Sequence, residues 1–154
     1  MPRMLTSLSF VVRGDSMRPA LRDGHRILVD TRAYQHAPPA RGDVVLFWRR
    51  LLGQRERIPS IKRVMGLPGE HLQMREGKVY LNGAPLWEPY APSTPPPEAG
   101  LPSQWVVGAG QYFLLGDNRG DSYDSRRLGP VDAGDLLGVA WLRYWPPWAW
   151  GRIS

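Results

Sequence analysis

Short apolar runs separated by turn-forming residues constrain this chain more than any other feature of its sequence. The 154 residues include 17 glycines and 16 prolines, and runs of apolar, β-branched and aromatic residues recur between them. Such runs are typical of strands, whereas helix candidates are few and short. We therefore expect a mostly β fold. Strands are expected at Leu8–Val12, Arg26–Asp30, Val44–Trp48, Ile61–Met65, Val79–Leu81, Tyr112–Leu115 and Leu137–Tyr144.

Two turn sequences and a proline-rich segment organise the middle of the chain. The segment 75–78 is typical of a hairpin turn between His71–Met74 and Val79–Leu81, and Asn82-Gly83 marks a second reversal. Six prolines between residues 88 and 102 remove backbone donors and favour extended, solvated chain, so we expect an exposed loop there. A linker between two domains is the alternative, but the strands that follow are too few to bury a separate core. We therefore expect a single domain over residues 1–154.

Composition excludes several classes of function. Cysteine is absent, and the three histidines lack the spacing of metal ligands, so we expect no metal, no cofactor and no cysteine chemistry. A net charge of +6 suits an anionic partner, but the basic residues are scattered and no nucleic-acid module is present, so nucleic acid is not expected. No run of about 18 apolar residues exists, so no transmembrane anchor is expected in this chain. The stretch Leu5–Val12 has no small-residue cleavage site, which indicates a strand and not a signal peptide.

The C-terminal segment 141–150 holds four of the seven tryptophans. Tryptophan beside arginine suits the membrane–water boundary, where the indole ring is amphipathic and arginine meets lipid phosphates. Alternate rings could equally fill a β core. A lipid surface is therefore an expected partner, with core packing as the open alternative.

A serine and a lysine are the candidate chemical groups. A serine hydroxyl needs a neighbouring base, and no histidine lies in the context of the usual triad. A lysine can replace histidine when burial disfavours its ammonium form, and Lys62 lies inside the apolar run Ile61–Met65. Ser16 follows an expected strand, and Pro19 restricts the backbone after it. Taken alone, the tetrapeptide that contains Ser16 would be only a turn after a strand.

Four segments together resemble the successive boxes of type I signal peptidases, in that family's order. The resemblance runs from about Phe10 to Ile153 and includes the closing strand. The segments are Gly14-Asp15-Ser16-Met17-Arg18-Pro19-Ala20-Leu21, Gly42-Asp43-Val44-Val45, Ile61-Lys62-Arg63-Val64-Met65-Gly66-Leu67-Pro68-Gly69-Glu70 and Gly116-Asp117-Asn118-Arg119-Gly120-Asp121-Ser122-Tyr123-Asp124-Ser125-Arg126.

The resemblance implies roles for individual residues. Ser16 would be the nucleophile and Lys62 the general base of a Ser-Lys dyad, with Ser122 hydrogen-bonded to the lysine. The remaining implied supports are an ion pair of Asp124 with Arg126, and Gly116 and Asn118, which would shape the loop near the dyad.

The oxyanion site follows the family only in part. The backbone N–H of Ser16 is the natural first donor. The second donor is open, because Gly14 stands where some family members have serine. Ala20 departs from the usual threonine and leaves the local hydrogen bonding around Pro19 open.

The resemblance also implies a fold and an activity. The expected fold is mostly β, with coiled antiparallel sheets that are partly barrel-like. The expected enzyme is a serine endopeptidase that removes N-terminal signal peptides at the extracytoplasmic face of the cytoplasmic membrane. The extended signal peptide would pair with the strand Phe10–Arg13 and the Lys62 strand, and shallow pockets would admit small side chains, giving Ala-x-Ala sites. Candidate pocket walls are Phe10, Val12 and Met17.

Three alternatives stay open from the sequence. Self-cleaving repressor domains resemble the same Ser-Lys architecture, but they lack the stretch 116–126 found here. A specialised relative that trims pilin or conjugation substrates would use the same dyad on a narrower substrate. A non-catalytic β module would bind peptide, lipid or nucleic acid through the basic, tryptophan-rich surface.

Overall fold

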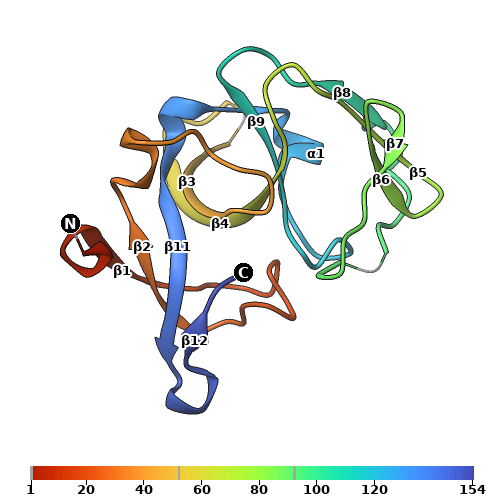
Figure 1. The fold of residues 1–154 in the computed structure, drawn as a ribbon. Helices are drawn as coiled ribbons and strands as arrows, with labels where there is room; N and C mark the ends of the chain where they lie inside the picture. The colour runs from red at the N-terminus through yellow and green to blue at the C-terminus, as the bar shows by residue number, and fades with distance from the viewer. Residues whose placement is uncertain (1, 52, 92) are drawn as a thin grey trace.

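The chain folds into two antiparallel sheets of unequal size, as a computed structural model that describes residues 2–51, 53–91 and 93–154 shows (Figure 1). The helices are short, as expected: α1 (Ser125–Leu128) and the 3-10 helices η1 (Arg3–Thr6), η2 (Ala33–Gln35), η3 (Ala133–Asp135) and η4 (Pro147–Ala149). The strands are β1 (Ser7–Val11), β2 (Arg26–Asp30), β3 (Val44–Arg50), β4 (Arg57–Gly66), β5 (His71–Arg75), β6 (Lys78–Leu81), β7 (Ala84–Pro85), β8 (Gln104–Val106), β9 (Gln111–Leu115), β10 (Val131–Asp132), β11 (Leu136–Trp145) and β12 (Gly151–Arg152).

The larger sheet carries the candidate base. Within the described residues its strand order is β1-β2-β11-β3-β4-β9-β10, with β12 paired to β11. β4 pairs with β3 along Arg57–Arg63, which sets Lys62 opposite Val45, and then pairs with β9 from Arg63 onward. The expected mostly β class with antiparallel sheets is confirmed. The sheet curves without closing into a barrel in the part of the chain described, since its order ends at β1 and β10.

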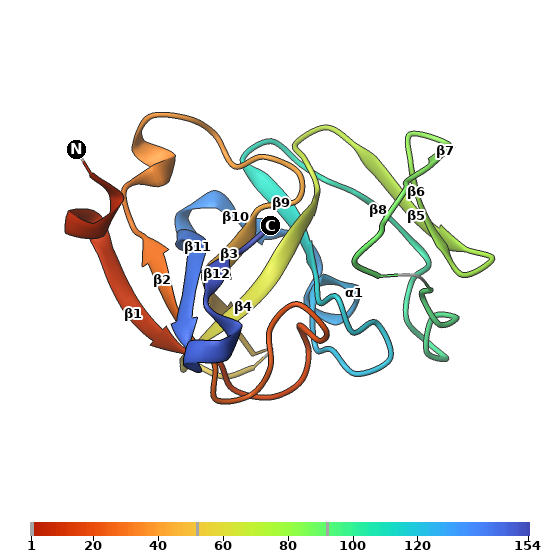
Figure 2. The ribbon, with the colours of Figure 1, turned by 60° about the horizontal axis from the view of Figure 1, so that its bottom comes forward.

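The smaller sheet has the order β7-β6-β5-β8 and lies beyond β9 in Figure 2. Its two reversals are those expected from the sequence. Glu76 and Gly77 have φ of 52° and 72°, and Asn82 and Gly83 have φ of 49° and 85°. Consecutive positive φ values favour Gly and Asn and suit tight hairpin turns. The hairpin of β5 and β6 is therefore specified by local chemistry.

Three hydrophobic clusters form the core. One lies around β1, β2 and β11 and includes Ile27, Val29 and Ala140. A second joins the small sheet to β9, with Leu72 and Val79 packed in the same cluster as Phe113. A third fills the space around β3, β4 and β9. Because the two sheets share buried side chains, the small sheet packs against the larger one.

The proline-rich segment 88–102 is a loop that is held to the sheets at two points. Its described residues form no helix or strand, and Ala91 and Thr94 are buried. Thr94 donates its backbone N–H to the Gly77 carbonyl at 3.0 Å, and its hydroxyl accepts from Arg119. These contacts hold part of the segment against the sheets, while most of its described residues are exposed. Pro92, one of the six prolines, lies outside the described residues.

A membrane crossing by a helix would need a long apolar helix. None of the helices in residues 2–51, 53–91 and 93–154 has that length and character.

Candidate functional site

Ser16 lies in the turn that follows β1 and is held there by contacts from a distant loop. Its backbone carbonyl accepts the Asn118 N–H at 2.9 Å, and the Asn118 side-chain amide donates to the Asp15 carbonyl at 3.2 Å. Gly14 has a φ of 79°, a region open chiefly to glycine. Its N–H donates to Asp23 Oδ1 at 2.7 Å. Two separate parts of the chain therefore fix the backbone around the Ser16 hydroxyl.

Lys62 projects from β4 to this hydroxyl. Its Nζ donates to Ser16 Oγ at 2.8 Å and to the Ile61 carbonyl at 3.0 Å, and the residue is only 4% exposed. The pKa of Lys62 is lowered to about 8, chiefly by burial; the carboxylate of Asp124 opposes this lowering, and the positive charge of Arg49 adds to it. Burial disfavours the ammonium form because the charge loses its hydration. The lysine can therefore exist as a neutral amine near physiological pH.

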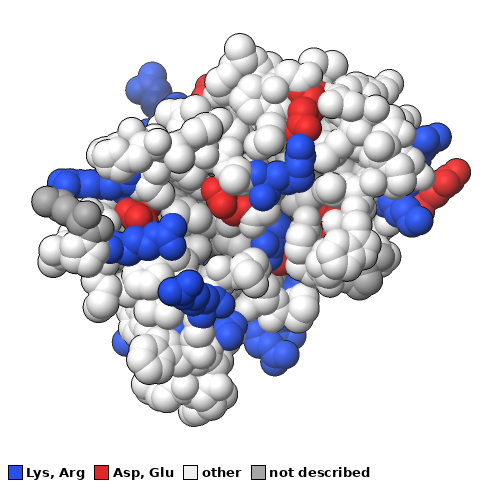
Figure 3. Space-filling model, viewed as in Figure 1, with Lys and Arg blue, Asp and Glu red and all other residues white. Residues whose placement is uncertain are grey.

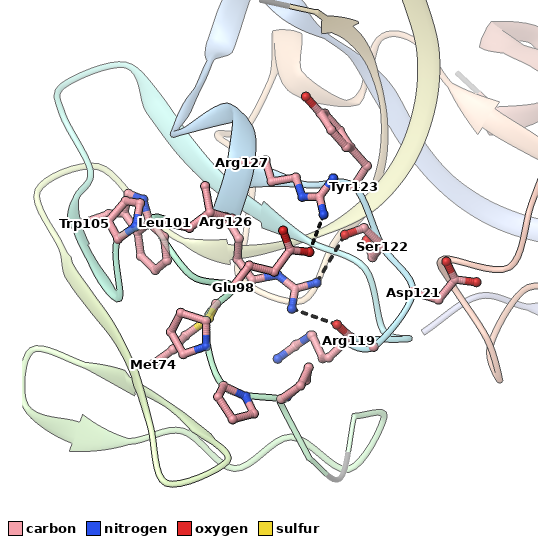
Figure 4. Close-up of a pocket in the computed structure, with 15 residues that line it drawn as sticks. Met74, Glu98, Leu101, Trp105, Arg119, Asp121, Ser122, Tyr123, Arg126 and Arg127 are labelled. Carbon is pink, nitrogen blue, oxygen red and sulfur yellow. Dashed lines mark hydrogen bonds and ion pairs between the residues drawn. The ribbon is translucent and has the colours of Figure 1, made fainter.

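The loop 116–124 and the start of α1 form a hydrogen-bonded support beside this pair. Asp124 caps α1, accepts the Gly116 N–H at 3.0 Å and pairs with Arg126, whose Nε lies 2.9 Å from Oδ1. Arg126 also donates to the Arg119 carbonyl at 2.8 Å and the Ser122 carbonyl at 3.4 Å. The expected pair of Asp124 with Arg126 is thus present. Figure 4 shows the contacts of Arg126 with Arg119 and Ser122, which hold the loop.

Ser122 does not make the hydrogen bond expected of it. In the described part of the chain its buried Oγ has no hydrogen-bond partner, and the recorded partners of Lys62 are Ser16 and Ile61. Its side chain instead occupies the space above Gly116, where an added Cβ would collide with it and would lie 2.6 Å from the Ser16 carbonyl oxygen. The missing side chain of Gly116 therefore decides where the Ser122 hydroxyl lies.

A cleft of about 270 Å³ opens beside Ser16 and Lys62. Phe10 lines it, together with Ile58–Ile61 of β4. Val12 and Met17 do not: both are 1% exposed and belong to the core cluster around β1 and β2. Of the three expected pocket residues, the structure brings only Phe10 to the cleft surface, because the chain turns after Val11 and directs the other two side chains inward.

Comparison with known proteins identifies the chain. Residues 1–145 match the family described as signal peptidase, peptidase S26. The chain belongs to this family. A signal peptidase I of Leptolyngbya laminosa is 39% identical over 140 residues, which cover 88% of this chain and 67% of that protein. A probable signal peptidase I-1 of Synechocystis sp. is 36% identical over 147 residues, covering 93% and 74%.

A solved structure gives the same assignment. The crystal structure of a signal peptidase I from Enterococcus faecalis V583 is similar with a TM-score of 0.52 and 33% identity, covering 66% of this chain and 95% of that one. Membership of the signal peptidase family makes the chain a peptidase of the signal peptidase I type. The alternative of a non-catalytic β module is therefore not supported.

Sequence reasoning missed the buried ion pairs of this signal peptidase family member. Arg63, next to Lys62 on β4, pairs with Asp117 at 2.7 Å, and both side chains are almost fully buried. Arg119 pairs with Glu88, and its Nε donates to the Gly116 carbonyl at 2.7 Å. The pair of Arg63 with Asp117 could have been suspected, because Arg63 is a charged residue inside an apolar run. No local feature of the sequence indicates that Glu88 is buried.

A second cavity, of about 390 Å³, lies on the other side of the loop (Figure 4). Its wall combines Trp105 and Met74 of the small sheet with prolines of the segment 88–102 and the side chains of Arg126 and Arg127. Tyr123 lines both this cavity and the cleft beside Ser16. The loop therefore separates the two hollows, and Tyr123 contributes to each.

Proposed function

We propose that this chain is a serine endopeptidase that removes N-terminal signal peptides from exported preproteins, with Ser16 as nucleophile and Lys62 as general base. The observation that carries the proposal is the 2.8 Å contact of Ser16 Oγ with the Nζ of a buried lysine. With a pKa of about 8, about one lysine in ten is neutral at pH 7. A base poised in this range can take a hydroxyl proton and later return it.

The proposed reaction proceeds through an acyl-enzyme. The neutral Nζ of Lys62 takes the hydroxyl proton as Ser16 Oγ bonds to the scissile carbonyl carbon, and the carbonyl π electrons move to its oxygen. Collapse of the tetrahedral intermediate breaks the C–N bond, and the ammonium gives its proton to the leaving amine. Water then attacks the ester, and the lysine takes the water proton and returns it to Ser16.

The backbone N–H of Ser16 is the proposed first oxyanion donor. The Gly14 N–H is already engaged by Asp23, which argues against its use as the second donor. Gly116, Asn118, Asp124 and Arg126 would act by holding the loop against the nucleophile and base, since their hydrogen bonds converge there. Ser122 would support the lysine only after its side chain rotates from the position over Gly116.

The substrate is proposed to bind as an added strand. Within the described residues, Ile58–Lys62 of β4 pair with β3 on one side only, and β1 is an edge strand. Both border the cleft through Phe10 and Ile58. An extended peptide can pair with such a bare edge, and a cleft of about 270 Å³ suits small side chains, in keeping with Ala-x-Ala sites.

Cleavage of a preprotein with an Ala-x-Ala site tests the proposal. The chain would be compared with its Ser16→Ala and Lys62→Met variants in the presence of detergent, and mass spectrometry would locate the cut. Cleavage after the second alanine that both substitutions abolish is the expected result. Cleavage elsewhere, or cleavage that survives Lys62→Met, would contradict the assigned dyad.

We further propose a lipid surface as partner, at the extracytoplasmic face of the cytoplasmic membrane. Trp148 and Trp150 are 87% and 69% exposed, and Trp145 is also exposed. They lie at the tip formed by η4 and the ends of β11 and β12, which is free of charged side chains at its extremity in Figure 3. The exposed Arg26 lies 5.8 Å from the Trp145 ring. Exposed indoles beside arginine favour the interfacial region of a bilayer.

A further inference from the structure

Arg49 is a cation in the cleft beside Ser16 that has no ion pair among the described residues. It lies near the end of β3, opposite Ile58 of β4, and lines the cleft with Ser16 and Lys62. Its Nε is buried and has no hydrogen-bond partner among the described residues, and no carboxylate there lies within 4.0 Å of its guanidinium. A half-buried cation that lines a cleft and has no counter-ion favours an anionic ligand there.

Tyr123 packs against the Arg49 guanidinium at the cleft. The Arg49 Cζ lies 5.2 Å from the centroid of the Tyr123 ring, and Arg127 lies 5.2 Å from the same centroid. Arg127 differs in having a partner, because it pairs with Glu98 and lines the second cavity. A cation held against an aromatic ring is already oriented. Arg49 therefore places an oriented positive charge in the cleft that Lys62 also lines, and this charge lowers the pKa of Lys62.

The other charges of the cleft leave the positive charge of Arg49 uncompensated. Arg13, also in the lining, is exposed and has no ion pair in the described part of the chain. Asp15 is paired with Arg18 at 2.9 Å. Asp121 lines the cleft, but its carboxylate points away from the Tyr123 ring against which Arg49 packs (Figure 4). The cleft next to the reacting groups is thus positively charged.

We propose that Arg49 binds a carboxylate of the peptide substrate within three residues of the scissile bond, so that the enzyme prefers an acidic side chain there. This inference rests on the function proposed above. Arginine forms paired hydrogen bonds to carboxylates, and Arg49 lines the cleft with no carboxylate partner among the described residues. A partly desolvated contact of this kind is expected to raise kcat/KM by roughly tenfold.

The test is a set of Ala-x-Ala peptides that carry Glu or Gln at each of the three positions on either side of the cut. The measured quantity is the ratio of kcat/KM for the Glu peptide to that for the Gln peptide at one pH. A substitution at Arg49 also changes the pKa of Lys62, but this change affects the Glu and Gln peptides equally and therefore cancels in the ratio. The variants are Arg49→Gln, Arg49→Lys and the matched control Arg127→Gln, which removes the other arginine packed on Tyr123.

The expected result is a roughly tenfold preference for Glu at one position or more, which falls to about one in Arg49→Gln, is partly kept in Arg49→Lys and is unchanged in Arg127→Gln. A ratio near one in the unsubstituted enzyme, or a preference that survives Arg49→Gln, would overturn the proposal. Binding of the same labelled peptides to Ser16→Ala gives a readout without hydrolysis. If no peptide is cleaved, the proposed peptidase activity is contradicted. The ratio of Kd for the Gln peptide to Kd for the Glu peptide still tests the role of Arg49 in that case.

Discussion

At the scale of single residues, Lys62 titrates under two opposing charges. Arg49 lowers its pKa and Asp124 raises it, on top of the lowering by burial. Replacing Arg49 with Gln removes a positive neighbour, so the ammonium becomes more favourable and the pKa of Lys62 rises. We expect kcat/KM for a neutral peptide to rise with pH through a pKa of about 8, and this limb to move to higher pH in Arg49→Gln. A pH profile of both enzymes measures the shift, and a limb that stays in place or moves to lower pH would contradict the assigned charge coupling.

The charged form of Lys62 also lowers the stability of the fold. Its pKa is about 8 when folded and 10.5 as the ordinary value, so the unfolded chain binds more protons between these pH values and stability rises with pH across that window. Below about pH 8 the full cost is present, on the order of 3 kcal/mol. Lys62→Met should therefore raise Tm at pH 6.5 and do so less at pH 10.5. Calorimetry at both pH values measures this, with Ser16→Ala as the control that keeps the lysine.

Ser16 and Lys62 were predicted as a pair from a turn after a strand, a lysine inside an apolar run and the resemblance of four segments to one family. The structure brings them to 2.8 Å. The orientation of Ser122 could not be predicted, because it depends on space above Gly116. The burial of Val12 and Met17 depends on how the chain turns after β1, which a residue pattern does not specify.

At the scale of elements, two glycines of the loop 116–124 offer a matched pair. A Cβ at Gly116 would lie 2.6 Å from the Ser16 carbonyl oxygen, whereas a Cβ at Gly120 would meet nothing within 4 Å. Because the Ser16 backbone cannot move without moving the proposed nucleophile, Gly116→Ala should lower stability by about 1–3 kcal/mol and activity by a larger factor. Gly120→Ala should leave both unchanged. Urea unfolding and kcat/KM measure the contrast; equal effects would contradict the packing role of Gly116.

The segment 88–102 is anchored to the same loop by a buried ion pair. The side chains of Glu88 and Arg119 are 5% and 0% exposed, and Arg119 also donates to Thr94 at 3.0 Å. Removing Glu88 leaves a buried cation without its carboxylate, so Glu88→Ala should cost about 3 kcal/mol and expose the segment to proteolysis. Replacing Glu98 with Gln, in the exposed pair with Arg127, should change little. Limited proteolysis and urea unfolding compare the variants, and equal losses would contradict the anchoring role.

The elements themselves show what the sequence can specify. The seven expected strands are all present, with boundaries shifted by a few residues, because each carries its own apolar run. The short strands β7, β8, β10 and β12 were not predicted. β8 pairs with β5 and β12 pairs with β11, so these strands exist through partners distant in sequence. The ion pair of Glu88 was not predicted for the same reason, because its partner Arg119 lies 31 residues away in the sequence.

At the scale of the whole molecule, the proposed lipid contact combines the net charge of +6 with the tryptophan tip. Basic side chains are attracted to anionic lipid over about a Debye length, and the indole rings then enter the interface. Binding to vesicles that contain anionic lipid should therefore weaken as salt increases. The part of the binding that depends on the tryptophans should persist at high salt. A change in tryptophan fluorescence on titration with vesicles measures both contributions.

Two tryptophan variants separate the tip from general surface hydrophobicity. Trp148→Ala and Trp87→Ala each remove an indole of nearly equal exposure, 87% and 83%. Trp148 lies in η4 at the tip, whereas Trp87 follows β7 on the small sheet at the opposite side of the molecule (Figure 1). If the tip meets the bilayer, Trp148→Ala weakens binding severalfold and Trp87→Ala does not. Equal losses would mean that the whole surface associates without preference, and a loss confined to Trp87→Ala would place the membrane contact on the small sheet instead.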